Sequence, residues 1–281
     1  MDPFVFAAVL FAAACHAGWN AAAKKALDPL AATVLISVGA ALVSLPLVPF
    51  VGAPAPAAWP WVAASVAIHL FYFAALIESY RAGDMGQVYP IARGSAPLLT
   101  ASASTWLIGE PIGPLAWAGI VLLATGVLLL SVRGGRDLGR LERRAVGFAL
   151  LTAVTICAYS LVDGIGARLA GSAPAYSVAL FIGIAPVMVV YALARRGPAV
   201  IPAMRPHWGS GLLGGALQLG SYGIAIWAMT VAPIAIVAAL RETSVLFGAL
   251  IAIIFLGEPL RLVRIVAAMA IVTGLVLIRL S

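Results

Sequence analysis

Long apolar runs follow one another along nearly the whole chain, separated by short polar segments rich in glycine and proline. A helix needs about 20 predominantly apolar residues to cross the hydrocarbon core of a bilayer. Ten runs reach about this length, and turn-forming or charged residues bound them. They cover residues 3–23, 30–51, 60–80, 86–108, 112–132, 145–167, 174–195, 207–229, 232–256 and 260–280. The pattern therefore predicts an all-α polytopic membrane protein with ten transmembrane helices.

An arginine followed at a fixed distance by Gly-Glu-Pro occurs twice in the chain. Arg93 precedes Gly109-Glu110-Pro111 by sixteen residues, and Arg241 precedes Gly257-Glu258-Pro259 by sixteen residues as well. The two copies lie 148 residues apart. A repeat of this length in a strongly hydrophobic chain indicates a duplicated bundle of membrane helices.

A charged linker at 133–144 separates the two copies. It divides the chain into a five-helix repeat at 1–132 and a second at 145–281. On the linker side of the predicted membrane the loops hold thirteen basic residues, whereas the opposite side holds only Arg168 and Arg279. Because cytoplasmic loops carry an excess of Lys and Arg, the linker is predicted to be cytoplasmic and both termini periplasmic. An odd number of helices per repeat inverts the second copy, as in alternating-access carriers.

Composition supports a membrane location and gives no indication of a nucleic-acid partner. The chain is 63% hydrophobic and 10% charged, whereas soluble domains carry about 25% charged residues. The lipid bilayer is therefore an expected partner. The net charge of +7 comes from loop residues and is explained by orientation. The spacing of His16, His69 and Asp163 matches no metal site or catalytic triad, so we predict no catalytic residues, metal or cofactor.

The duplicated five-helix halves, each with Gly-Glu-Pro between its fourth and fifth helix, resemble the drug/metabolite transporter superfamily and its paired EamA domains. The resemblance covers nearly the whole chain. It implies a basket of helices around a central cavity formed by helices 1, 3, 4, 6, 8 and 9, with helices 5 and 10 at the periphery. The chain is similar to bacterial ten-span aromatic amino-acid exporters, which implies a place in the inner membrane. We expect a monomer rather than an obligate oligomer.

Two arginines lie inside predicted helices, about 10 Å from an end at 1.5 Å per residue. An arginine at the centre of a membrane helix costs about 2.5–3.5 kcal/mol or more. Arg93 and Arg241 therefore either extend to the interface or face the cavity, where a guanidinium holds a carboxylate bidentately. Glu242 follows Arg241 but points about 100° away from it on a helix, so the two are not necessarily partners.

Other inner helices carry aromatic and polar-tipped side chains at helical spacing. Such groups inside a membrane usually face the protein interior, and lipid-facing filler is the alternative for each aromatic. The candidate substrate-binding residues are His16, Trp19, Asn20, His69, Tyr72, Phe73, Tyr80, Tyr89, Arg93, Tyr159, Asp163, Gln218, Tyr222 and Arg241. A cavity of this kind suits a zwitterion with an apolar side chain and fits a phosphate poorly.

The sequence predicts a secondary carrier that exports small organic solutes, foremost aromatic or other neutral amino acids, by alternating access. The alternatives are a carrier of another metabolite or drug, an intramembrane enzyme acting on a lipid, and a channel. Glu78, Asp163 and Glu242 are candidate proton carriers, with internal salt bridges or a solvated helix end as the other interpretation. The Gly-Glu-Pro corners are predicted to be structural: glycine ends one helix, proline begins the next, and glutamate complements that helix's N-terminus.

Overall fold

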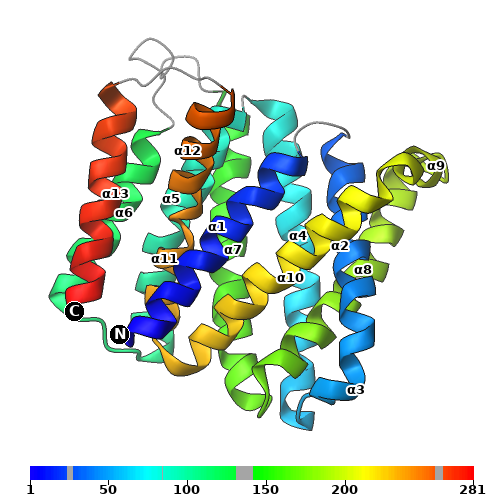
Figure 1. The fold of residues 1–281 in the computed structure, drawn as a ribbon, viewed down its shortest axis with the longest axis horizontal. Helices are drawn as coiled ribbons and strands as arrows, with labels where there is room; N and C mark the ends of the chain where they lie inside the picture. The colour runs from blue at the N-terminus through cyan, green and yellow to red at the C-terminus, as the bar shows by residue number, and fades with distance from the viewer. Residues whose placement is uncertain (24–27, 84, 131–141, 257–261) are drawn as a thin grey trace.

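A computed structural model describes residues 1–23, 28–83, 85–130, 142–256 and 262–281, without the side chains of residues 19–23, 85–87, 252, 255 and 256. Every element in these ranges is helical, and the long helices run roughly parallel or antiparallel in one bundle (Figure 1). The linker, apart from its last residues, and the second Gly-Glu-Pro corner lie outside the described residues.

The helices follow the ten predicted runs in order. The first repeat holds α1 (Pro3–Ala23), α2 (Pro29–Ser44), η1 (Leu45–Leu47), α3 (Val48–Val51), η2 (Pro56–Ala58), α4 (Trp59–Ala82), α5 (Met85–Ala103), η3 (Ser104–Ile108) and α6 (Pro114–Leu129). The second holds α7 (Arg143–Leu169), α8 (Ala173–Arg196), α9 (Val200–Met204), η5 (Arg205–His207), α10 (Trp208–Val231), α11 (Ile234–Arg241), α12 (Ser244–Leu256) and α13 (Leu262–Leu280).

Seven helical segments among the described residues are long and apolar enough to cross a membrane. They are Pro29–Val51, Pro56–Ala82, Arg143–Leu169, Ala173–Arg196, Val200–Val231, Ile234–Ile251 and Leu262–Leu280. Pro3–Gly18 and Pro114–Leu129 are apolar but shorter. Helix α5 is less apolar than α4 and α6 because it carries Arg93 and other polar residues. The number of ten crossings therefore remains a prediction.

Both chain termini lie at one end of the bundle, whereas α6 ends and α7 begins at the opposite end (Figure 1). We refer to these ends as the termini side and the linker side. This arrangement is the one expected when the second repeat enters the bundle inverted with respect to the first.

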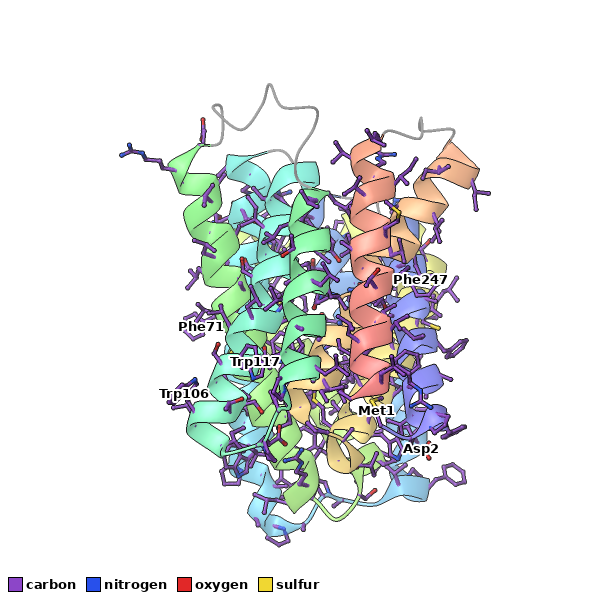
Figure 2. All side chains as sticks on the ribbon, turned by 90° about the vertical axis from the view of Figure 1, so that its left-hand side faces the viewer. Met1, Asp2, Phe71, Trp106, Trp117 and Phe247 are labelled. Carbon is purple, nitrogen blue, oxygen red and sulfur yellow. The ribbon has the colours of Figure 1, made fainter. Side chains whose placement is uncertain are left out.

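Helices α6 and α13, the last of each repeat, pack closely at one edge of the bundle, which faces the viewer in Figure 2. The backbones approach so closely that a Cβ atom on Gly119 would lie 2.7 Å from the carbonyl oxygen of Gly274. A Cβ on Gly126 would lie 2.8 Å from the carbonyl oxygen of Ala267. Small residues allow this approach between membrane helices. The peripheral pair agrees with the place that the family resemblance implies for helices 5 and 10.

The ninth predicted run is not one helix, because the chain breaks between α11 and α12. The N–H groups of Glu242 and Thr243 bond to carbonyl oxygens three residues back, at 3.0 and 3.2 Å. The Thr243 hydroxyl also donates to the carbonyl of Leu240 at 2.7 Å. A hydroxyl that competes for a helix carbonyl loosens the regular ladder. The sequence contains no glycine or proline at this point, and for that reason a continuous helix was expected.

The first Gly-Glu-Pro corner is structural, but its detail differs from the prediction. Gly109 ends η3 with a φ of 77°, as expected for a left-handed helix cap. Pro111 does not start the next helix, since α6 begins at Pro114 after Gly113. Glu110 does not complement α6; instead its Oε2 accepts a 2.9 Å hydrogen bond from the N–H of Ile234, at the start of α11.

We predict that Gly119→Leu lowers the thermal stability of the purified protein, because its side chain would push against the backbone of α13. Overpacking of this kind costs about 1–3 kcal/mol. Gly147→Leu in α7 is the matched control, since a Cβ at Gly147 meets no atom within 4 Å. Equal melting temperatures for the two variants in detergent would contradict the close packing of α6 on α13.

Candidate functional site

Buried polar and aromatic side chains from several helices meet in the interior of the bundle. Most come from α1, α4, α5, α7, α10 and α11, which correspond to the first, third, fourth, sixth, eighth and ninth predicted spans and which the family resemblance places around a central cavity. Tyr176 of α8 and Ser244 of α12 join them. Charged residues at this depth need partners within the protein, because the hydrocarbon core offers none.

The first interaction at this site is an ion pair between the two repeats. The Arg93 Nε on α5 lies 2.7 Å from Glu242 Oε2 at the break between α11 and α12. Both side chains are almost completely buried, with 2% and 3% of their surface exposed. The Arg93 Nη2 also donates to Ser244 Oγ at 3.0 Å. Arg93 therefore does not extend to the interface; it binds the second repeat to the first.

Arg241 has a different environment, although it occupies the same position in its repeat. It is 7% exposed, and its guanidinium carbon lies 4.5 Å from the centre of the Tyr222 ring. A cation over an aromatic face is attracted by the ring quadrupole. Among the described side chains, none forms an ion pair or a hydrogen bond with Arg241. Its charge is therefore buried without a direct ion pair from the described part of the chain, and the neighbouring Glu242 carboxylate acts on it through space.

Asp163 on α7 is the complementary case. Its carboxylate is fully buried and accepts hydrogen bonds from the hydroxyl groups of Tyr176, at 2.9 Å, and Tyr222. Within the described ranges, no basic side chain forms an ion pair with it. Tyr222 thus contacts Asp163 through its hydroxyl group and Arg241 through its ring face.

Aromatic rings form the wall beside these charges. His69 stacks on Tyr159 with ring centres 4.5 Å apart, and Tyr159 meets Tyr72 and Tyr222 edge to face at 5.5 and 5.6 Å. His69 Nδ1 lies 2.9 Å from the carbonyl oxygen of Ser65. A carbonyl only accepts, so this nitrogen carries the hydrogen and the ring is held in one orientation.

The remaining predicted residues are divided between this cluster and its edges. His16 on α1 interacts electrostatically with Arg93 and Arg241. Tyr89 lies one turn before Arg93, whose guanidinium carbon is 5.8 Å from its ring centre. Both His16 and Tyr89 are only half-buried although their neighbours in the interior are buried, which indicates accessible space beside them.

Other predicted residues lie at the edge of the cluster or outside the described side chains. Phe73 is 5% exposed and packs on Tyr72 with ring centres 5.0 Å apart. Tyr80 packs in a smaller apolar group together with Val88 and Ala92. Gln218 lies one turn before Tyr222 on α10, and its Oε1 has no hydrogen-bond partner among the described residues. The side chains of Trp19 and Asn20 lie outside the described residues.

Sequence reasoning missed three members of the site. Glu242 was noted without a partner, because the helix break that turns it toward Arg93 was not foreseen. Tyr176 and Ser244 were not singled out, and both gain their role only through contacts with distant segments. A hydroxyl group two residues after a membrane-embedded carboxylate was the available signal for Ser244.

A second network joins four helix ends on the termini side. Arg168 Nη2 lies 2.5 Å from Glu110 Oε1, and its Nε donates to the carbonyl oxygen of Met229 at 2.9 Å. The other oxygen of Glu110 accepts from Ser104 Oγ at 2.6 Å as well as from the start of α11. One carboxylate and one guanidinium thus link the ends of η3, α7, α10 and α11.

Comparison with known proteins gives the family and the fold. The model of the EamA-like transporter family matches residues 4–132 and 143–280, one match for each repeat. A solved structure described as "Crystal structure of protein" superposes with a TM-score of 0.75 at 19% sequence identity, over 99% of this chain and 96% of that chain. At that identity the likeness concerns the fold alone. No curated protein matches the sequence.

We predict that Glu242→Gln destabilises the protein by about 3–5 kcal/mol, because it leaves the buried Arg93 charge without its partner. Glu78→Gln is the control, since Glu78 pairs with exposed arginines and such pairs contribute about 0–1 kcal/mol. The double variant Arg93→Met/Glu242→Met removes both charges and should recover most of the loss. A direct buried pair would be contradicted if the double variant unfolded at no higher temperature than Glu242→Gln.

Proposed function

Because the chain belongs to the EamA-like transporter family, a family of membrane transporters, we propose that it is a secondary carrier of zwitterionic amino acids with neutral or aromatic side chains. One observation carries this proposal. Among the described residues, neither the buried Arg241 guanidinium nor the buried Asp163 carboxylate has an ion-pair partner, and Tyr222 contacts both.

Isolated charges in a low-dielectric interior are unfavourable by several kcal/mol each. A zwitterion supplies both missing charges, since its carboxylate pairs bidentately with Arg241 and its ammonium group with Asp163. A simple anion would satisfy only the arginine, and a simple amine only the aspartate. The second arginine is not available for a phosphate, because Glu242 occupies Arg93.

The aromatic wall supports an apolar or aromatic side chain on the transported amino acid. Tyr72, Tyr159 and His69 lie beside Tyr222, with ring centres 4.5–6.3 Å apart. Aromatic pairs at such distances favour edge-to-face or offset arrangements, which a further ring can join.

Transport by alternating access needs contacts between the repeats that open in turn. On the termini side Glu110 of the first repeat pairs with Arg168 of the second. On the linker side Glu78 pairs with Arg195 at 2.8 Å, and Asp28 with Arg196 at 3.1 Å. Each of these ion pairs crosses from one repeat to the other. In the proposed cycle the two groups of ion pairs alternately open, and the site between them faces one side at a time.

We propose export across the inner membrane, in the orientation that the basic loops favour. With the basic loops in the cytoplasm, the linker side faces the cytoplasm and the termini side the periplasm. The zwitterion then enters from the linker side and leaves at the Glu110–Arg168 network.

Counterflow of labelled substrate into proteoliposomes tests the substrate. We expect uptake of phenylalanine, and much weaker uptake of phenethylamine and 3-phenylpropionate, which each lack one charge. Arg241→Gln should reduce phenylalanine uptake about 10- to 100-fold, the effect of losing a charged hydrogen bond of about 1.5–3 kcal/mol. The same substitution should change phenethylamine uptake little, because this amine has no carboxylate.

Asp163→Asn should show the reverse selectivity: it should reduce phenylalanine uptake and change 3-phenylpropionate uptake little, because this acid has no ammonium group. Arg205→Gln, which alters an exposed arginine of η5, is the matched control. The proposal is wrong if Arg241→Gln transports phenylalanine as the unaltered protein does. Uptake of another metabolite or a drug, with none of any amino acid, would favour the alternative carrier function.

Orientation is tested by thiol labelling in spheroplasts. In a background with Cys15→Ser and Cys157→Ser, we expect a membrane-impermeant maleimide to label Ser281→Cys on the termini side. Arg205→Cys on the linker side should be labelled only after the membrane is permeabilised. The reverse pattern would show that the termini face the cytoplasm.

A further inference from the structure

A lateral groove lies between α12 and α13 in the half of the bundle nearer the linker side. Its cavity measures about 440 Å³. Leu246, Leu250 and Ile253 of α12 line one wall, and Ala268, Met269 and Val272 of α13 line the other. Several of these side chains are exposed, Met269 to 56%, so the groove opens sideways to the surroundings of the bundle.

The groove exists because the two repeats pack differently at this point. In the first repeat α5 packs along α6, whereas its counterpart α12 packs on α1 and not along α13 within the described residues. Helix α13 packs on α6 instead. On the termini side Arg279 Nη1 donates to the carbonyl oxygen of Met1 at 3.1 Å and fastens α13 to the start of α1. The groove lies between α12 and α13, where the two helices do not pack on each other within the described residues.

Among the described residues that line this groove, Arg264 carries a charge. Arg264 lies in the first turn of α13, at the end of the groove nearer the linker side, and it is half-buried. A guanidinium at the membrane interface pairs well with a phosphate group, because its planar donors match the phosphate oxygens. Below it the walls are apolar over about 13 Å of α13, at 1.5 Å per residue from Arg264 to Thr273. The groove thus has an anionic-headgroup end and an acyl-chain end.

A second lateral groove provides an internal comparison. It measures about 500 Å³ and is lined by residues of α3, α4 and α8, among them Trp59, Val62 and Val178. No charged residue belongs to its lining. An acyl chain can fill this groove, but nothing in its lining selects a headgroup. Charge complementarity therefore distinguishes the α12–α13 groove from an ordinary lipid-facing depression.

We propose that the α12–α13 groove binds an anionic glycerophospholipid, with one acyl chain between the two helices and the phosphate group on Arg264. Basic sites between membrane helices on the cytoplasmic side bind lipid headgroups in this manner. The bound chain gives α12 the lateral packing that α5 receives from α6. Since α12 continues from the break at Glu242, the lipid supports the segment that holds the Arg93 partner.

The experiment uses the purified full chain, equilibrated in detergent with equal amounts of phosphatidylglycerol and phosphatidylcholine. Native mass spectrometry then counts the lipids that remain bound. We expect the unaltered protein to retain phosphatidylglycerol preferentially. Arg264→Gln should reduce this preference about fivefold, the effect of one basic residue near a membrane surface. Arg264→Lys should retain most of this preference. Arg205→Gln should retain all of it, because η5 follows α9, which lies on the linker side at the lateral edge opposite α13 (Figure 1).

A second variant tests the groove itself. Ala268→Phe fills it and should lower the retention of phosphatidylglycerol, whereas Ala63→Phe in the uncharged groove should leave the headgroup preference unchanged. The proposal is overturned if Arg264→Gln and Arg205→Gln behave alike, or if Ala268→Phe retains the lipid fully. Competition by soluble glycerol 3-phosphate as effective as by the lipid would also overturn it, because the groove would then contribute nothing.

Discussion

The ion pair between Arg93 and Glu242 is the interaction on which the interior depends. Lipid solvates neither charge, so each is tolerable only while the other is in place. Because Arg93 and Glu242 belong to different repeats, their ion pair fixes how the two repeats pack against each other in the middle of the bundle. The helix break at Glu242 is part of the same arrangement, since the carboxylate could not turn toward α5 from an uninterrupted helix in the predicted orientation.

The duplicated arginines have diverged in role while keeping their position. In the first repeat the residue after Arg93 is Gly94, where a Cβ would lie 2.6 Å from the Leu128 side chain, so a glutamate has no room there. The corresponding residue after Arg241 is Glu242, which neutralises the arginine of the other repeat. Glu242 contacts Arg93 directly, so Arg241 has no ion-pair partner among the described residues. The two repeats therefore differ in charge at corresponding positions, and in the proposed function this difference provides a single place for a substrate carboxylate.

The sequence predicted the features that depend on local chemistry. Apolar runs located the helices, the repeated spacing revealed the duplication, and helical spacing placed Tyr159 and Tyr222 in the interior. It could not predict which arginine was neutralised, because Arg93 and Glu242 are separated by 148 intervening residues and joined only by packing. The α11–α12 break was missed because no glycine or proline marks it in the sequence. The partner of Glu110 was missed for a similar reason: α11 and η3 are distant in sequence and adjacent in space.

Arg241 connects the proposed substrate site to the contacts that hold α11 in the bundle. It is the last residue of α11, the residue after it holds Arg93, and the start of α11 is bound by Glu110. A helix of eight residues fixed at both ends moves as one piece. In the proposed cycle, a carboxylate bound to Arg241 acts on a segment whose other end belongs to the termini-side network of Glu110 and Arg168. Through this short helix, binding at the proposed site would reach the ion pair that opens for release.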